Sequence, residues 1–125
     1  MTKKIVFVDD EETIRKLVKI ALDAEGYDCQ IAANGEEGLT KIKQIKPDLA
    51  ILDIMMAKMN GLELAENIKK DKNLENTKII VLSAKDKDFC SVEDNDKLSQ
   101  IDAYLNKPFD LNKLIKMITK YIGSK

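Results

Sequence analysis

The sequence predicts one α/β domain in which a parallel five-stranded sheet lies between two layers of helices. Short apolar segments alternate five times with amphipathic segments along 125 residues, a length that suits one domain with one core. The segments KIVFV, LAIL and IIVL are apolar on both faces and do not alternate with polar residues. Strands of this kind are typical of a parallel sheet that helices cover on both sides.

The five expected strands are short apolar or β-branched runs that end near a polar residue. They are Lys4–Val8, which acids follow, and runs within YDCQIA (27–32), DLAILD (48–53), KIIVLSA (78–84) and DAYLNKPF (102–109), the last centred on 103–105. Right-handed crossovers leave few topologies for these strands. The expected order is 2-1-3-4-5, the flavodoxin-like winding.

The expected helices carry apolar residues at i, i+3 and i+4 spacing, which gives each helix one dry face. In ETIRKLVKIALDAEGY (12–27), Gly26 stands where a left-handed cap is needed. The next helices are NGEEGLTKIKQIK (34–46), which stops before Pro47, GLELAENIKKD (61–71) and DLNKLIKMITKYIG (110–123). The polar segment 85–100 is expected to contain the remaining helix, the fourth in chain order.

Composition and charge exclude several classes of function. With 21 basic and 22 acidic residues the net charge is −1, so nothing drives nonspecific binding to nucleic acid or acidic membranes. No apolar run approaches the roughly 20 residues that span a bilayer. Acids follow the short N-terminal apolar run at once, which argues against a signal peptide, and we expect a cytoplasmic protein without membrane insertion.

The cysteine and histidine content narrows the chemistry further. Cys29 and Cys90 are far apart and form no CxxC pair, so both are expected to be reduced thiols. The chain contains no histidine, which removes His-based zinc sites and His general bases.

Polar residues that carry chemistry follow the strands at their carboxyl ends. Asp9 and Asp10 follow the first strand, Asp53 ends the third, Ser83 ends the fourth, and Lys107 follows the fifth. In an open parallel sheet the ligand site lies beyond these ends, where the winding reverses between the first and third strands. The three carboxylates are therefore expected to converge in one small cleft, with a hydroxyl and an ammonium beside them.

Such a cluster favours Mg²⁺ and phosphoryl transfer. Carboxylates a few ångströms apart repel one another, and a divalent cation relieves that repulsion. Mg²⁺ is a hard ion that needs only one or two carboxylates, waters and a phosphate, whereas zinc and copper lack their usual ligands here. Lys107 would balance a phosphate oxygen, Ser83 would donate a hydrogen bond, and Asp53 can become an acyl phosphate.

Each of these residues taken alone has a plainer interpretation. Asp9 and Asp10 can serve as helix N-caps, Asp53 as a turn acid, Ser83 as a strand-end hydroxyl, and Lys107 as a surface lysine. The evidence for a site is their joint occurrence at four strand ends.

The motifs FVDDEE, LAILDIMMAKMNG, VLSAK and DAYLNKPF together resemble the landmarks of response regulator receiver domains of two-component signalling, the CheY-like family. The resemblance spans essentially the whole chain, so residues 1–125 are expected to form a single receiver domain with no effector domain. Receiver domains are themselves examples of the 2-1-3-4-5 winding, so the expected strand order is not independent of this resemblance.

The resemblance implies a role for each landmark residue. Asp53 is the phospho-acceptor, and Asp9, Asp10 and Asp53 hold Mg²⁺ together with the backbone carbonyl of Met55, Asp10 more directly than Asp9. The cofactor is therefore Mg²⁺ alone.

The same resemblance implies a conformational switch. Ser83 binds a phosphoryl oxygen and draws its loop inward, and Tyr104 is the aromatic residue that changes position with it. Lys107 pairs with the phosphoryl group, and Pro108 fixes the following turn, often through a cis bond.

The implied activity is a phosphorylation-activated signalling switch in a phosphorelay. The donor is a phosphohistidine on a histidine kinase or histidine phosphotransfer protein, and the chain catalyses its own phosphorylation and dephosphorylation without being a turnover enzyme in the usual sense. A downstream protein is expected on the face formed by the fourth helix, fifth strand and fifth helix. The chain is expected to be a monomer or a phosphorylation-dependent dimer that does not contact nucleic acid.

The sequence departs from the family pattern at several positions. Ala57 stands where proline is usual, Gln100 stands where glycine is usual, and the stretch from Ser83 to Lys107 is slightly long. Met55 and Lys85 occupy positions that vary among receivers, and we expect the bulky Met55 to slow hydrolysis by screening the attacking water.

Three alternatives stay open at this point. A Mg²⁺-dependent phosphohydrolase usually has an Asp-x-Asp pattern on its first strand, whereas here the acids are adjacent. A flavin carrier needs a Gly-, Ser- or Thr-rich phosphate loop after that strand, and DDEE would repel the phosphate. A receiver that signals without phosphate would not need the landmark residues that this chain retains.

Overall fold

A computed structural model describes residues 2–56, 59–83 and 101–123 of the chain. The elements in chain order are β1 (Lys4–Val8), α1 (Glu12–Ala24), β2 (Asp28–Ala32), α2 (Gly35–Ile45), β3 (Leu49–Asp53), α3 (Gly61–Lys70), the 3₁₀ turn η1 (Lys72–Leu74), β4 (Lys78–Ser83), β5 (Ala103–Asn106) and α5 (Leu111–Ile122). The expected fourth helix, together with Lys85, Cys90 and Gln100, lies outside the described residues, so the labels pass from α3 to α5.

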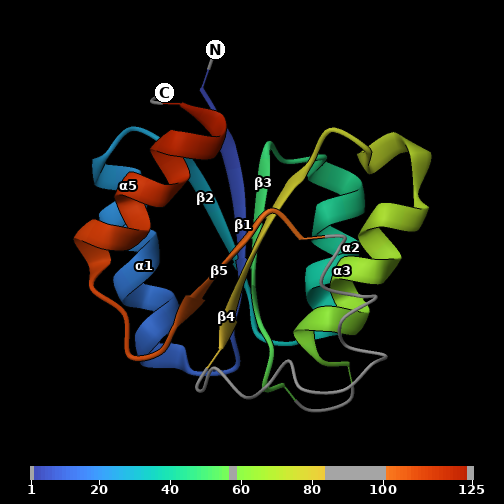
Figure 1. The fold of residues 1–125 in the computed structure, drawn as a ribbon, viewed down its shortest axis with the longest axis horizontal. Helices are drawn as coiled ribbons and strands as arrows, with labels where there is room; N and C mark the ends of the chain where they lie inside the picture. Colours follow the sequence, from blue (N-terminus) through green and yellow to red (C-terminus); the bar gives the residue numbers. More distant parts are fainter. Residues whose placement is uncertain (1, 57–58, 84–100, 124–125) are drawn as a thin grey trace.

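The five strands form one parallel sheet in the order β2-β1-β3-β4-β5, which confirms the predicted winding. Figure 1 shows α1 and α5 against one face of the sheet and α2 and α3 against the other. The fold therefore has the three layers that the sequence predicts. The carboxyl ends of β1 and β3 lie side by side because these two strands pair directly.

Alternate residues of each inner strand feed two separate apolar layers. Val6 and Val8 of β1 belong to the layer beneath α2 and α3, whereas Ile5 and Phe7 belong to the layer beneath α1 and α5. Every residue of β3 is buried. Burying an aliphatic side chain of this size stabilises a fold by about 1.5–3 kcal/mol, so the sheet is held from both sides.

Side-chain caps fix the starts of the two helices that follow β2 and β3. The Asn34 side chain accepts a hydrogen bond from the Glu37 N–H at 2.9 Å at the start of α2. Asn60 and Glu63 form a reciprocal capping box at the start of α3.

The start of α3 also packs directly against the end of β3. A Cβ atom at Gly61 would lie 2.5 Å from the Asp53 carbonyl oxygen and 3.0 Å from the Ile54 Cα. The Gly61 N–H instead donates to the Ile54 carbonyl at 3.1 Å. Only glycine permits this close approach, which places the first residue of α3 against the end of the strand that carries Asp53.

The remaining backbone details agree with the expectations for turns. Gly26 has φ 94°, as expected for a residue just beyond the end of α1, and the Lys107–Pro108 peptide is cis. None of the helices in the described part of the chain has the length and apolarity of a membrane-spanning segment.

Candidate metal and phosphoryl site

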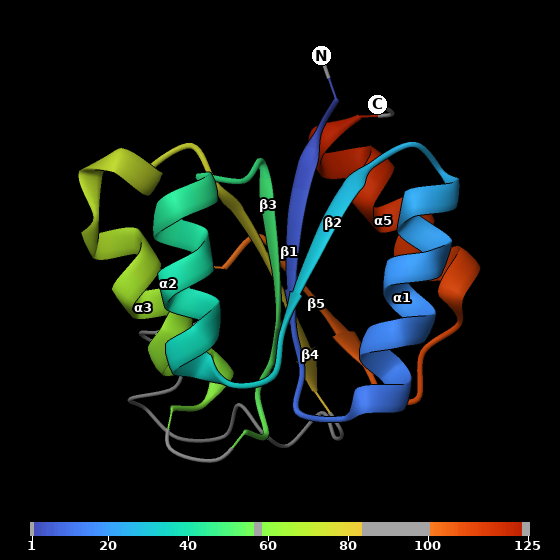
Figure 2. The ribbon, with the colours of Figure 1, turned by 180° about the vertical axis from the view of Figure 1, so that it is seen from behind.

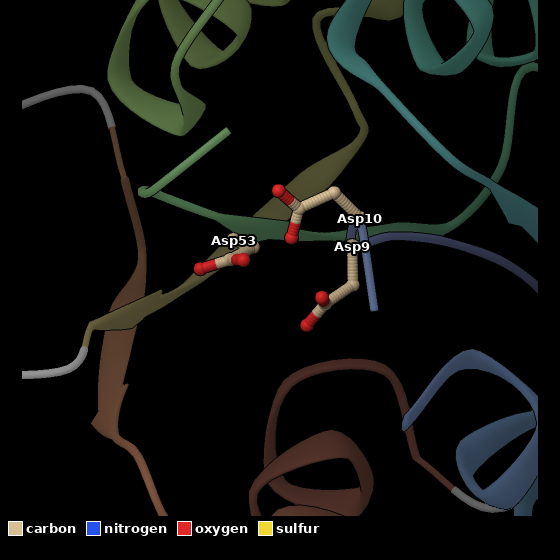
Figure 3. A group of neighbouring side chains, drawn as sticks. All are labelled: Asp9, Asp10 and Asp53. Atoms are coloured by element: carbon tan, nitrogen blue, oxygen red, sulfur yellow. The ribbon is translucent and has the colours of Figure 1, made fainter. Parts of the chain in front are cut away.

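Three carboxylates lie together where β1 and β3 end. Asp9 and Asp10 directly follow β1, and Asp53 is the last residue of β3. One oxygen of each carboxylate lies within 4.8 Å of the other two, and Figure 3 shows the three side chains around one common space. The convergence predicted from the strand ends is confirmed.

Asp9 is the buried anchor of this group, with 0% of its surface exposed. Its Oδ1 accepts a hydrogen bond from the Glu11 N–H at 2.9 Å, and its Oδ2 accepts one from Lys107 Nζ at 2.9 Å. Arg15 on α1 donates from Nη1 to the Asp9 main-chain oxygen at 2.8 Å. Asp10, in contrast, is exposed. Asp9 therefore fixes the turn after β1, and Asp10 presents its carboxylate to solvent.

The alternative role of these acids as helix caps does not hold. The N-cap residue of α1 is Glu11, and its side chain makes no capping hydrogen bond. Asp9 and Asp10 precede that residue, so the turn they form belongs to the carboxylate cluster and not to the helix end.

Asp53 is almost fully buried, with 3% of its surface exposed. Its Oδ1 accepts a hydrogen bond from the Met55 N–H at 3.3 Å, and its Oδ2 lies 3.3 Å from Lys107 Nζ. The Met55 side chain is 63% exposed. The acid is thus held by a main-chain donor on one oxygen and by an ammonium on the other.

Lys107 brings a positive charge to the cluster from β5. Its Nζ lies 2.9 Å from Asp9, 3.3 Å from Asp53 and 3.9 Å from Glu11. Its N–H donates to the Ser83 carbonyl at 2.6 Å, which ties the end of β5 to the end of β4. The ammonium therefore sits between the two buried acids, as the sequence predicts.

Burial and charge shift the ionisation of these groups. Burial and the charge of Asp9 raise the pKa of Asp53 to about 6, and they outweigh the opposing effects of Lys107 and the Met55 N–H. Burial disfavours the charged form of Lys107, but its hydrogen bond to Asp9 and the charge of Asp53 outweigh that effect and raise its pKa. The positive charge of Lys107 therefore does not fully offset the negative charges of the acids.

The donor set fits a hard divalent cation. All three ligand candidates are carboxylates, one of them exposed to water, and the described residues place no histidine or thiol among them. An ion with several retained waters and one or two carboxylate ligands is the arrangement that Mg²⁺ favours. The remaining charge imbalance around Asp53 points the same way, since a cation would relieve it.

The expected switch residues lie on the two outer strands, β4 and β5. Ser83 is the fully buried last residue of β4 and pairs in register with Asn106. Tyr104 pairs with Val81, two positions earlier, and is 51% exposed. The structure thus places Ser83 at the site end of the sheet and the half-exposed Tyr104 farther down β5.

Two residues of the site carry no sequence signal that predicts their role. Arg15 reaches the Asp9 carbonyl from the first turns of α1, and Glu11 adds a carboxylate at the edge of the Lys107 contacts. Arg15 is separated from Asp9 by six positions, and only the direction in which α1 leaves the turn brings them together.

The family model for the response regulator receiver domain matches residues 5–119. The chain belongs to this family. This receiver is 38% identical over 127 residues to the alkaline phosphatase synthesis transcriptional regulatory protein PhoP of Bacillus subtilis, covering 96% of the chain and 50% of that protein. It is 30% identical to the polar-differentiation response regulator DivK of Brucella ovis, covering 98% of both.

Solved structures give the same result. A CheY-like receiver domain protein from Methanospirillum hungatei is 33% identical with a TM-score of 0.86, covering 98% of this chain and 94% of that one. The response regulator TrrA from Thermotoga maritima, solved in complex with Mg(2+)-BeF, is 38% identical with a TM-score of 0.84, covering 96% and 99%. The receiver spans about half the length of the first curated relatives, which are transcriptional regulatory proteins, and nearly all of DivK.

Family membership argues against the two alternatives from outside the family, the phosphohydrolase and the flavin carrier. It does not by itself separate a receiver that uses phosphate from one that signals without it. That distinction depends on the chemistry of the carboxylate cluster.

Proposed function

We propose that this receiver is a phosphorylation-activated switch in which Asp53 accepts a phosphoryl group from a phosphohistidine. The observation that carries the proposal is the placement of Lys107 between two buried acids, 2.9 Å from Asp9 and 3.3 Å from Asp53, beside an exposed third acid. A surface cluster of structural acids would not need a buried counter-charge.

The three acids would hold Mg²⁺, with the backbone carbonyl of Met55 as a further ligand. Bound Mg²⁺ supplies positive charge that offsets the acids and the charge on the transferring phosphoryl oxygens. Asp10 is exposed and suits direct contact, whereas Asp9 already accepts hydrogen bonds on both carboxylate oxygens. The related response regulator TrrA was solved in complex with Mg(2+)-BeF, which supports Mg²⁺ as the ion.

In the transfer step, an Asp53 carboxylate oxygen attacks the phosphorus of the donor. A P–O bond forms, the P–N bond to the imidazole breaks, and its electron pair returns to the ring nitrogen. Lys107 Nζ stays within reach of a phosphoryl oxygen, because it already lies 3.3 Å from Asp53 Oδ2. Hydrolysis removes the phosphoryl group again. Water attacks the phosphorus, the bond between phosphorus and the Asp53 oxygen breaks, and inorganic phosphate leaves.

The donor would be a histidine kinase or a histidine phosphotransfer protein. An open groove of about 520 Å³ adjoins Lys107 and is lined by apolar residues of α1, of the turn after β5 and of the start of α5, including Leu17, Phe109 and Leu111. Leu17 is 55% exposed and Ile20 of the same helix is 70% exposed. An apolar strip beside the acceptor suits a partner that must bring its phosphohistidine to Asp53.

Phosphorylation would change the conformation of the protein through Ser83 and Tyr104. Ser83 is buried at the site end of β4, and its main-chain carbonyl accepts a hydrogen bond from the Lys107 N–H at 2.6 Å. A hydrogen bond from its hydroxyl to the phosphoryl group would pull on β4 and shift the equilibrium that positions Tyr104. The output would be a downstream protein bound near β5 and α5, with the protein working in the cytoplasm as a monomer or phosphorylation-dependent dimer.

Incubation with acetyl phosphate and Mg²⁺ tests the acceptor directly. We expect intact-protein mass spectrometry to show the gain of one phosphoryl group, and EDTA to prevent it. Asp53→Asn should abolish the gain, whereas Asp28→Asn, a change of the same kind on β2, should leave it intact. Normal labelling of Asp53→Asn, or no labelling of the wild type, would refute the proposal and leave the receiver that signals without phosphate.

The exposed Met55 offers a second test. Its side chain follows Asp53 by two positions, and we propose that it screens the water that hydrolyses the acyl phosphate. Met55→Asn should shorten the half-life of the phosphorylated state several-fold, measured by the decay of the mass shift after acetyl phosphate is removed. An unchanged half-life would show that Met55 does not control this water.

A further inference from the structure

The outer edge of β2 carries main-chain groups that none of the described strands pairs. The strand order places β1 beside β2 on one side only. In a parallel ladder, successive residues point their N–H and C=O groups to opposite sides. Ala32 uses the inner side, where its carbonyl accepts from the Asp9 N–H at 3.1 Å. Positions 29, 31 and 33 therefore face outward.

An ion pair of α1 binds both outward groups of the first of these positions. Lys19 Nζ donates to the Cys29 carbonyl at 2.6 Å, and Asp23 Oδ1 accepts from the Cys29 N–H at 3.2 Å. Lys19 and Asp23 are four residues apart on the helix and pair at 3.1 Å. One donor and one acceptor thus stand where an adjacent strand would place its own.

An ion pair of α2 repeats this arrangement from the opposite face of the sheet. Lys41 Nζ donates to the Ile31 carbonyl at 2.5 Å, and Glu37 Oε1 accepts from the Ala33 N–H at 3.0 Å. Lys41 and Glu37 lie 4.0 Å apart, and Figure 2 shows α1 and α2 on the two sides of β2. We call these four residues the edge cap: Lys19, Asp23, Glu37 and Lys41.

We propose that the edge cap keeps β2 closed to strand addition, and that a second copy of this chain pairs with β2 when the cap is removed. An uncapped edge is a template for another strand, because its donors and acceptors lie in a row. The second copy is the occupant because two identical β2 edges can pair antiparallel about a twofold axis, each supplying the groups that the other lacks.

The cap is distinguished from an ordinary lysine contact by its pairing of both group types. Lys69 of α3 also donates to a main-chain carbonyl, that of Thr77 at 2.9 Å, but Thr77 precedes β4, an inner strand. Only at β2, among the described residues, do two helices each supply a donor and an acceptor to one strand edge. The arrangement acts independently of the proposed phosphoryl transfer, because no residue of the carboxylate cluster takes part.

The test removes both lysine donors while keeping their aliphatic stems. The double variant Lys19→Met and Lys41→Met should show a concentration-dependent rise in mass by sedimentation velocity, under reducing conditions and without phosphate donor. The double variant Lys16→Met and Lys70→Met is the control, since it removes two charges from i,i+4 pairs that do not touch β2. It should sediment like the wild type.

Hydrogen exchange identifies the surface involved. In the associated variant the amide of Ile31 should exchange at least tenfold more slowly than in the control, as expected for a new inter-strand hydrogen bond. Equal masses for variant and control up to millimolar concentration, or association without protection at Ile31, would overturn the proposal. If the double variant does not fold, the single variants Lys19→Met and Lys41→Met each free one of the two carbonyls that the lysines bind, and they are judged by the same two measurements.

Discussion

Lysine and carboxylate pair in two contrasting places in this receiver. The Lys107 side chain is 14% exposed and contacts acids that are 0% and 4% exposed, whereas Lys16 and Glu12 on α1 are each 68% exposed. The shortest distances are nearly equal, 2.9 Å at the buried site and 2.8 Å on the helix. Distance alone therefore does not determine how much an ion pair contributes to stability. Burial matters more, because solvent screens the exposed pair and not the buried one.

The largest expected effect comes from removing each lysine in turn. Lys107→Met should lower the free energy of unfolding by roughly 3 kcal/mol at neutral pH without Mg²⁺, since it leaves Asp9 and Asp53 buried without a counter-charge. Lys16→Met should leave it unchanged within the error of the measurement, because solvent screens the exposed pair with Glu12. Urea unfolding of both variants measures the contrast, and equal losses would contradict the role given to burial.

The same contrast should be visible as a pH dependence. Folding raises the pKa of Asp53 from 3.8 to about 6, so the folded state binds the proton more tightly than the unfolded state. Ionised Asp53 therefore costs stability: the cost is absent below about pH 4, grows between pH 4 and pH 6, and is complete above pH 6. The cost at pH 7 is on the order of 2 to 3 kcal/mol in the metal-free protein.

Asp53→Asn isolates this contribution. The variant should be more stable than the wild type at pH 7 by that amount, and the difference should vanish near pH 4. Excess Mg²⁺ should narrow the gap at pH 7, because a ligand of the folded state stabilises the wild type. A gap that stays constant from pH 4 to pH 7 would show that Asp53 titrates as an ordinary acid.

A smaller effect is expected when alanine replaces Gly61, which packs against Asp53, or Gly35, which packs against Met59. A Cβ at Gly61 would lie 2.5 Å from the Asp53 carbonyl oxygen, and a Cβ at Gly35 would lie 2.7 Å from the Met59 Cβ. Both alanine variants should lose about 1–3 kcal/mol through overpacking. Gly61→Ala alone should also slow phosphorylation by acetyl phosphate, roughly tenfold, because it displaces the acceptor. Equal phosphorylation rates in the two variants would show that Gly61 matters only for packing.

The sheet and the acids could be predicted because both depend on features that are local in the sequence. Apolar runs such as Leu49–Leu52 mark a strand buried on both faces, and the polar residue that ends each run marks its carboxyl end. Once the winding brings β1 and β3 together, Asp9 and Asp53 must be neighbours. The convergence therefore followed from the strand ends together with the expected strand order, which the family resemblance shares.

Contacts from helix side chains to strand main chains could not be predicted in this way. Whether Arg15 reaches the Asp9 carbonyl, or Lys41 reaches the Ile31 carbonyl, depends on the rotation of each helix about its axis and on side-chain conformation. Hydrophobic periodicity fixes which side of a helix faces the core, but it leaves the residues at the boundary undetermined.

Calorimetric titration of Mg²⁺ into the protein tests the central claim most directly. If one oxygen from each of Asp9, Asp10 and Asp53 contributes to one site, the wild type should bind one ion per chain, and Asp10→Asn should bind it at least tenfold more weakly. Glu66→Gln, a change of an acid on α3 away from the cluster, should bind as the wild type does. Equal affinities for the wild type and Asp10→Asn, or no binding by the wild type, would contradict the account.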